Sequence, residues 1–171
     1  MKFFHVLLAL TMFSPLWPFD LNRNPAPGDP FIIVNKANNK LAFIDDNKVQ
    51  FIVPAGTGKS NELTPEGLFT VKVKAVNPYY RKKDIPGGDP RNPLGTRWIG
   101  FDAKGTDGRI YGVHGTNQPW TVGKYVSQGC IRLKKEDVEK LYQRVPIGTK
   151  ILVTTSSKSF LQLGKENRAI K

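Results

Sequence analysis

Short apolar runs separated by turn-forming residues dominate the chain and predict a domain built mostly of strands. The clearest run is Gly67 to Val76, where apolar and polar residues alternate as in a strand with one buried face. The predicted strands cover residues 31–34, 40–44, 48–53, 67–76, 97–101, 109–114 and 149–154. Asp-Asp-Asn at 45–47 predicts a hairpin turn between the second and third strands.

One convincing helix is predicted, from Lys134 to Val145. Its apolar positions follow the helical spacing i, i+3, i+4 and i+7 and are Val138, Leu141, Tyr142 and Val145. Pro146 and Gly148 end the helix. The fold class expected is therefore a single, mostly β, sandwich-like domain with one helix packed on it.

Composition divides the chain into four parts. Residues 1–21 form a predicted leader, and residues 22–30, rich in proline, form a linker. The domain covers residues 31–155, and the polar, basic tail from 156 to 171 is expected to be frayed. Inside the domain, residues 77–96 lack an apolar period, and so long a loop is typical of a wall or lid over a functional site.

The leader indicates export. Met1-Lys2 precedes an apolar stretch that ends at Phe19, which is the layout of a secretory signal. Pro15 and Pro18 disfavour a membrane-spanning helix, and no clear cleavage site follows. We therefore expect an extracytoplasmic protein, whose leader either is cleaved or remains as a membrane contact.

Charge and cysteine content narrow the function. The 171 residues include 26 Lys and Arg against 14 Asp and Glu, a net charge of +12 that favours polyanionic partners. The single cysteine, Cys130, excludes an intramolecular disulfide and a cysteine-based metal cluster within one chain. Because His5 lies in the leader, a Cys–His site in the domain must use Cys130 and His114.

The surroundings of these two residues are compatible with nucleophilic chemistry, and also with a structural role as a small buried thiol and a hydrogen-bonding imidazole. Cys130 lies between polar residues and just before the predicted helix, whose N-terminus would stabilise a thiolate. Gly129 lets a substrate approach the backbone, and Arg132 suits a carboxylate. His114 ends a predicted strand and is followed by a glycine, a place where a catalytic side chain is often exposed.

The two motifs that hold these residues resemble those of one known family. His-Gly-Thr-Asn at 114–117 and Ser-x-Gly-Cys-Ile-Arg at 127–132 are similar to the paired signature of the YkuD-type L,D-transpeptidase catalytic domain. Thr-Pro-Glu-Gly at 64–67 and Asn-Pro-Leu-Gly at 92–95 resemble two further segments of that family, in the same order. The resemblance extends over about residues 31–155.

The resemblance implies a specific reaction. The cysteine, here Cys130, attacks the third residue of a peptidoglycan stem tetrapeptide and releases D-Ala, with His114 as the base. An amine of a second stem then resolves the acyl-enzyme, which gives a 3→3 crosslink. The substrate and oxyanion site is assigned to Gly129, Ser127, Arg132, Gly115 and Thr116. Such enzymes need no metal or organic cofactor, and carbapenems acylate their cysteine.

One departure and one alternative reaction accompany this assignment. Many family members have histidine immediately before the Gly-Cys pair, where this chain has Gln128, which hydrogen-bonds but carries no proton charge. Water could also resolve the acyl-enzyme, which would give a carboxypeptidase or a related cell-wall peptide hydrolase. The sequence does not separate these two outcomes.

Other readings of the chain are weaker. A wall-binding module without turnover would not need Cys130, and the scattered basic residues fit an anionic cell-wall polymer better than nucleic acid. Gly-Thr-Gly-Lys-Ser at 56–60 resembles the end of a phosphate-binding loop, but Val53 stands where that motif needs its first glycine. Trp120 is equally consistent with the substrate cleft and with the core.

Overall fold

The computed structural model describes residues 25–171. The predicted leader and the first residues of the predicted linker lie outside the described residues. Within residues 25–171, no helix is both long enough and apolar enough to cross a membrane.

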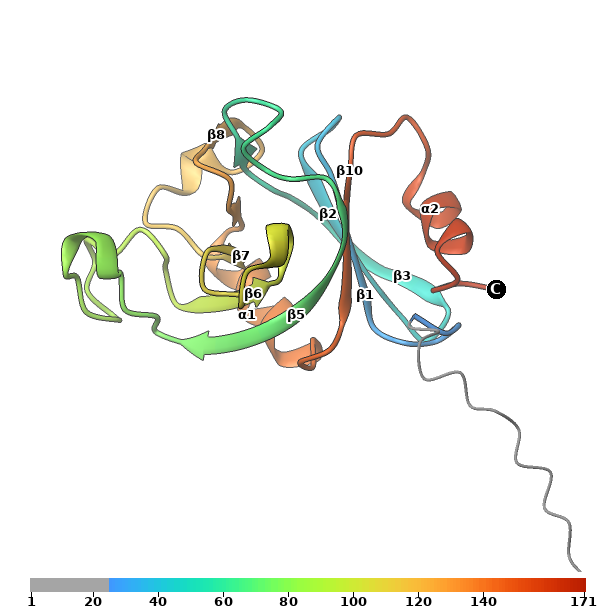
Figure 1. The fold of residues 1–171 in the computed structure, drawn as a ribbon, viewed down its shortest axis with the longest axis horizontal. Coiled ribbons are helices and arrows are strands. Elements are labelled where there is room, and N and C mark those ends of the chain that lie inside the picture. The colour runs from blue at the N-terminus through green and yellow to red at the C-terminus, as the bar shows by residue number, and fades with distance from the viewer. Residues whose placement is uncertain (1–24) are drawn as a thin grey trace, which may run out of the picture.

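One curled sheet of eight strands forms most of the molecule (Figure 1). Its strands, in spatial order, are β3 (Lys48–Pro54), β2 (Lys40–Asp45), β1 (Phe31–Asn35), β10 (Lys150–Thr154), β5 (Gly67–Val76), β6 (Arg97–Phe101), β7 (Tyr111–His114) and β9 (Ile131–Arg132). A separate parallel pair joins β4 (Thr57–Gly58) to β8 (Tyr125–Ser127). Each predicted strand is present. The three that the sequence did not predict, β4, β8 and β9, are too short to show alternation.

Strand β5 connects the two halves of the sheet. Its first residues, Gly67–Thr70, pair with β10, and Val71–Val76 pair with β6. The register of the second pairing shifts between Val71 and Val73, which is the signature of a bulge. Because bulges bend and twist a strand, β5 can turn one sheet back over itself. The two halves cross at a steep angle in Figure 1 and enclose the core between them.

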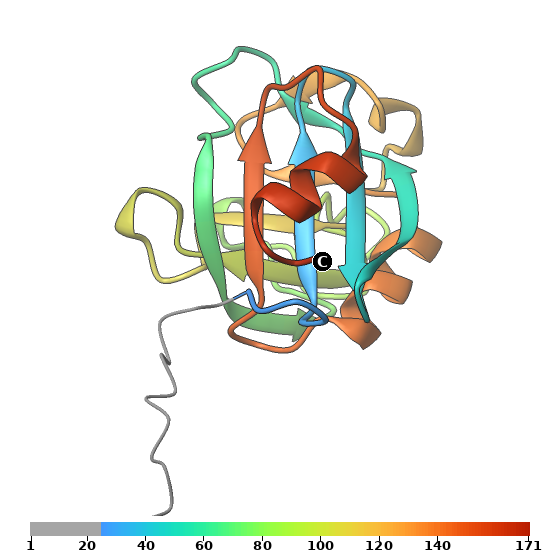
Figure 2. The same ribbon diagram turned by 90° about the vertical axis from the view of Figure 1, so that its right-hand side faces the viewer.

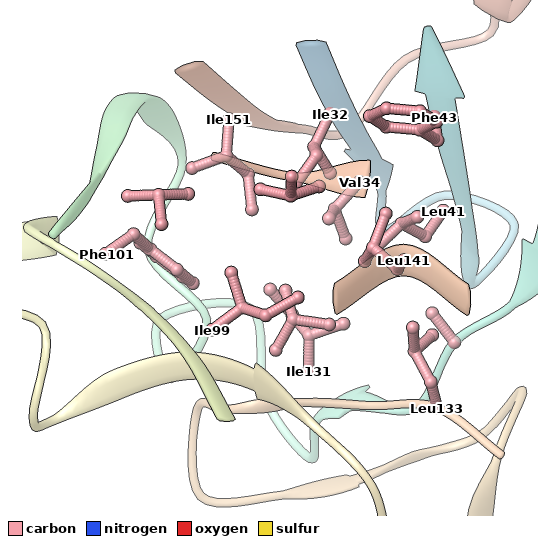
Figure 3. Close-up of a cluster of buried hydrophobic side chains, with 14 of the residues drawn as sticks. Ile32, Val34, Leu41, Phe43, Ile99, Phe101, Ile131, Leu133, Leu141 and Ile151 are labelled. Carbon is pink, nitrogen blue, oxygen red and sulfur yellow. The ribbon is translucent and has the colours of Figure 1, made fainter. Parts of the chain in front are cut away.

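The main core fills this curl (Figure 3). Ile32 and Val34 of β1 face Ile99 of β6 and Ile131 of β9 across it, and all four are fully buried or nearly so. The helix α1 (Lys135–Arg144) adds Leu141. This helix agrees with the predicted 134–145 to within one residue at each end.

The expected frayed tail is wrong. The C-terminal segment forms a second helix, α2 (Phe160–Glu166), which lies across the outer face of the sheet (Figure 2). Ser159 caps it by accepting a hydrogen bond from the N–H of Gln162 at 3.2 Å. Phe160 and Leu163 are buried against a second apolar cluster formed by β1 and β2. The segment has too few turns for its period to stand out among its polar residues.

This second cluster explains why residues 31–34 of β1 are all apolar. Ile32 and Val34 point into the main core, whereas Phe31 and Ile33 point toward α2. The members of the outer cluster are Phe31, Ile33, Ala42, Ile44, Phe160, Leu163, Ala169 and Ile170. The mostly β prediction is confirmed, with two helices in place of the single one expected.

The described part of the predicted linker is also tied to the domain. Gly28 donates a backbone hydrogen bond to Ala169, at 3.3 Å, and accepts one from Asp46, at 3.1 Å. Pro25 is buried. The segment before β1 and the segment after α2 therefore hold one another.

Three short 3-10 turns complete the chain: η1 (Arg81–Lys83), η2 (Ala103–Gly105) and η3 (Pro119–Thr121). The turn η1 lies in the long loop between β5 and β6, which extends away from the sheet at the left of Figure 1.

Leu163→Ala should lower the free energy of unfolding by about 2–4 kcal/mol, because it empties a buried site between α2 and the sheet. Leu161→Ala is the matched control on the same helix. Leu161 is 51% exposed, so we expect a loss below about 0.5 kcal/mol. Urea unfolding of both variants measures this, and equal losses would contradict the packing of α2.

Candidate active site

Cys130 lies in a tight turn between β8 and β9. The Ser127 hydroxyl donates to the Cys130 carbonyl at 2.6 Å and accepts from the Gly129 N–H at 3.1 Å. Gly129 has φ +131, and a Cβ there would lie 2.4 Å from the Leu63 carbonyl oxygen. The turn therefore requires glycine at this position. The structure brings Ser127 and Gly129 together with Cys130, as expected.

A buried threonine, Thr64, is hydrogen-bonded to the turn that contains Cys130. The Thr64 hydroxyl donates to the Gly129 carbonyl at 3.0 Å and accepts from the Gly58 N–H at 2.8 Å. Lys36, only 4% exposed, donates to the Thr64 carbonyl at 3.0 Å and forms an ion pair with Glu66 at 3.0 Å. The Thr-Pro-Glu-Gly segment thus positions the cysteine turn. Sequence reasoning matched this segment to the family but missed its structural task.

The Gly-Thr-Gly-Lys-Ser segment has a related structural role. Gly56 exchanges two backbone hydrogen bonds of 2.8 Å with Arg132, and Lys59 donates to the Ser127 carbonyl at 3.0 Å. The buried Thr57 hydroxyl donates to Asn39 at 2.6 Å. Within this segment Thr57–Gly58 form the short strand β4, and turns follow it directly in place of a helix, so the segment lacks the architecture of a phosphate-binding loop.

His114 ends strand β7. This strand runs parallel to β9, and His114 stands in register with Arg132, two residues beyond Cys130. The Trp98 indole of β6 stacks on the imidazole, with ring centroids 5.5 Å apart and an interplanar angle of 16°. Nδ1 lies 2.5 Å from the Gly115 carbonyl oxygen. Because that oxygen can only accept, Nδ1 carries the proton in the neutral ring and Nε2 is the basic nitrogen.

Burial lowers the pKa of His114 to about 4, and the positive charge of Arg132 acts in the same direction. Hydrogen bonds to the backbone of Gly115 and Leu94 oppose this shift but do not overcome it. The imidazole is therefore neutral at physiological pH and available as a base.

The long loop from Asn77 to Thr96 is fixed by a buried asparagine. The Asn92 side chain donates to the carbonyls of Pro78, at 2.8 Å, and Pro86, at 3.1 Å, and it accepts from the Leu94 N–H at 2.9 Å. Gly95 packs so closely on Gly115 that a Cβ there would lie 2.8 Å from its backbone. The Asn-Pro-Leu-Gly segment thus anchors the loop against the residue that follows His114.

This loop forms one wall of a cleft of about 420 Å³. The lining residues are Val73, Ala75, Pro78, Tyr79, Tyr80, Arg81, Lys82, Leu94, Trp98, Arg109, Ile110 and Cys130. The expectation that the loop is a wall of the site is confirmed. Trp98 lines the cleft and also contacts His114, a position that sequence reasoning did not assign. Trp120 is 65% exposed and does not line the cleft.

The Cys130 thiol is half-buried and donates to the Ile110 carbonyl at 3.4 Å. Burial raises the pKa of this thiol above its ordinary value. A hydrogen bond from the Gly112 backbone and the charges of Lys82 and Arg132 lower it, but less strongly. The expected helix stabilisation of a thiolate is not supported, because β9 separates Cys130 from the start of α1 at Lys135. The Cys130 thiol and the His114 imidazole are therefore both neutral at rest.

The remaining predicted residues lie around this pair. The Arg132 guanidinium reaches the Thr121 hydroxyl at 3.4 Å, and its buried Nε has no hydrogen-bond partner within residues 25–171. The Gly115 N–H donates to the Arg97 carbonyl at 3.3 Å, and Thr116 accepts from the Gln118 N–H at 3.0 Å. The backbone of Gly115 is thus committed to the sheet. Across the described part of the chain, His, Cys, Asp and Glu form no group of three or more that could hold a metal.

Comparison with known proteins agrees with this architecture. Residues 29–153 match the family model described as "YkuD: L,D-transpeptidase catalytic domain". A Bacillus subtilis (strain 168) protein provisionally named L,D-transpeptidase YqjB is 56% identical over 170 residues, covering 99% of this chain and 95% of its own. A Bacillus licheniformis protein provisionally named L,D-transpeptidase YkuD is 33% identical over 132 residues, covering 77% of this chain and 70% of its own.

Solved structures of the same fold are also similar. The Ldtfm–avibactam carbamoyl enzyme superposes with a TM-score of 0.57 at 27% identity, covering 75% of this chain and 49% of that one. Mycobacterium tuberculosis L,D-transpeptidase 3 with a faropenem-derived adduct gives a TM-score of 0.57 at 25% identity, covering 74% and 60%. This chain thus spans about half the length of the first of these solved chains. The protein belongs to the YkuD-type L,D-transpeptidase family.

The buried His114 should make stability depend on pH. Its pKa is about 4 in the folded protein and about 6.5 in the unfolded chain, so below pH 6.5 the unfolded state binds a proton that the folded state excludes. The free energy of unfolding should therefore fall by about 3 kcal/mol as the pH drops from 7 through 4.

Urea unfolding of the wild type and of His114→Gln at pH 7 and pH 4 isolates this contribution, because the other ionisable groups are common to both proteins. The wild type should lose more stability than the variant over this interval. Equal losses would mean that His114 is not held neutral by burial.

The raised pKa of Cys130 predicts slow alkylation of the resting enzyme. The rate constant for iodoacetamide should rise with pH to a midpoint above that of the same thiol in urea-unfolded protein. Because the chain has one cysteine, the unfolded protein is an internal reference. A native midpoint below the unfolded one would show a resting thiolate–imidazolium pair and contradict the neutral state.

Proposed function

We propose that the protein is a peptidoglycan L,D-transpeptidase in which Cys130 forms an acyl-enzyme with a stem tetrapeptide and makes 3→3 crosslinks. One observation carries the proposal: the only thiol of the chain opens onto the cleft from a turn whose outgoing strand, β9, pairs with the strand that ends in His114. The family membership supports the reaction class.

Acylation begins from the neutral pair. Cys130 Sγ attacks the carbonyl carbon of the third residue of the tetrapeptide while its proton passes to His114. The resulting tetrahedral intermediate collapses as the bond to the D-Ala nitrogen breaks, and His114 returns the proton to that nitrogen. The products of this step are a thioester on Cys130 and free D-Ala.

The second half of the reaction reverses these roles. The side-chain amine of a second stem peptide attacks the thioester carbonyl, and His114 accepts the proton that the amine loses. The carbon–sulfur bond then breaks, and His114 protonates the departing sulfur. A new amide crosslink forms, and Cys130 and His114 return to their resting state.

Within residues 25–171, the backbone N–H of Cys130 makes no hydrogen bond, whereas the N–H groups of Gly129 and Gly115 are both engaged. We therefore assign the oxyanion donor to Cys130 itself, in place of the two glycines. Arg132, whose Nε lacks a partner, supplies positive charge close to both reacting side chains. Ser127 and Gly129 act by holding the turn, and Thr116 by holding the segment after His114.

The same acyl-enzyme can be resolved by water, which would give a carboxypeptidase. The predicted leader supports an extracytoplasmic location for either reaction, and the net positive charge of the chain suits an anionic cell wall.

Incubation of the purified protein with a disaccharide-tetrapeptide, followed by mass spectrometry, tests the proposal. The wild type should form a crosslinked dimer with loss of one D-Ala per dimer. Cys130→Ala should form none, and His114→Gln should react at least about 100-fold more slowly, because it lacks the base. A carbapenem adduct on the wild type would report acylation independently.

The products separate the alternatives. Tripeptide without dimer would replace the transpeptidase with a carboxypeptidase. If neither product forms and no carbapenem adduct appears, the acyl-enzyme mechanism is wrong and a wall-binding role becomes the better explanation.

A further inference from the structure

The cleft beside Cys130 carries positive charge on one specific turn. Arg81 and Lys82 of η1 both line the cleft, together with Cys130. Their neighbour Lys83 belongs to the same turn but does not line it. Adjacent cations of one short turn therefore differ in whether they face the site.

These two charges are unpaired among the described residues. Arg109, the third cation of the cleft, forms an ion pair with Asp107. Neither Arg81 nor Lys82 takes part in a salt bridge or a side-chain hydrogen bond within residues 25–171. No Asp or Glu side chain lines the cleft. An anion entering it would therefore meet cations that need not give up an existing partner.

The turn is preformed. Tyr80 and Ile85 exchange backbone hydrogen bonds of 2.9 and 3.2 Å on either side of η1, and the Asp84 N–H donates to the Arg81 carbonyl at 3.4 Å. The Asn92 side chain ties the base of this hairpin to the rest of the loop. Binding an anion there would order two side chains without also ordering the backbone, which keeps the entropic cost small.

The charged turn is also close enough to the nucleophile to affect it. The positive charge of Lys82 is one of the groups that lower the pKa of the Cys130 thiol. In a tetrapeptide whose third carbonyl lies at Cys130, the side chain of that third residue lies in the same part of the cleft. A carboxylate on that side chain would therefore share the cleft with Lys82 and Arg81.

We propose that Arg81 and Lys82 bind a carboxylate on the side chain of the third stem residue, and that the enzyme therefore prefers donors that carry this group free over donors that carry its carboxamide. The inference rests on the proposed function, because it places the third residue at Cys130. Guanidinium and ammonium groups both donate charge-assisted hydrogen bonds to a carboxylate, whereas a carboxamide removes the charge.

The test uses two synthetic tetrapeptides that differ only in this group, a carboxylate in one and a carboxamide in the other. The rate constant for D-Ala release is measured with the purified protein and each peptide. The wild type should favour the carboxylate by about tenfold, the size expected for a charge-assisted contact in a partly enclosed cleft. Arg81→Gln/Lys82→Gln should bring the ratio of the two rate constants close to one.

Lys83→Gln is the matched control. It removes the same charge from the same turn but from a side chain outside the cleft, so it should keep the wild-type ratio. The single substitution Lys82→Arg should also keep most of the preference for the carboxylate peptide, because both positive charges of the turn remain. The ratio is insensitive to a general loss of nucleophile reactivity, which would slow both peptides equally.

A third peptide, amidated at the second residue, tests whether the carboxylate is the one we assign. It should release D-Ala as fast as the tetrapeptide that carries the free carboxylate. If this third peptide reacts as slowly as the carboxamide peptide, the assignment to the third residue is wrong. If the double variant keeps the wild-type ratio, the assignment to Arg81 and Lys82 is wrong. If D-Ala is released from none of the peptides, the proposed function itself fails, together with the inference.

Discussion

The structure depends on a single strand that serves two half-sheets. The first residues of β5 hydrogen-bond to β10 and the later ones to β6, with a register shift where the pairing changes. Without that continuity the half containing β6, β7 and β9 would be attached to the half containing β1 and β2 only through loops and through contacts such as the two Gly56–Arg132 backbone hydrogen bonds. The core between the halves would then have no fixed shape. The catalytic strands are thus positioned by pairing far from the chemistry.

Within that frame, buried polar side chains set the local geometry of the site. Thr64 and Asn92 each satisfy backbone groups from two separate loop segments. A buried polar group that lacks a hydrogen-bond partner destabilises the folded state, so each of these side chains favours one arrangement of its loop. Thr64 holds the turn that presents the thiol, and Asn92 holds the wall opposite it. The site is rigid on both sides although most of its residues lie in loops.

Much of this could be predicted from the sequence, for identifiable reasons. Strands such as β5 were predictable because apolar and polar residues alternate along them, and α1 because its apolar stripe spans two turns. Cys130 and His114 stand out in the sequence by elimination and by their motifs, and their catalytic role stays a prediction. The two-residue strand β9 and the short helix α2 lack enough residues for a period to appear. The protonation state was not predictable either, because it depends on burial by Trp98 and the loop, which only the folded chain brings to His114.

The stacking of Trp98 on His114 has a consequence beyond orientation. Because the buried imidazole and the thiol are both uncharged at rest, the site holds little of the thiolate that peroxides and disulfides attack. An enzyme with one cysteine has no second thiol in its own chain to reverse oxidation by forming a disulfide. A thiol that is deprotonated only when a substrate is bound would then be protected from oxidation. The free energy needed to deprotonate the thiol would come from binding the peptide that it attacks.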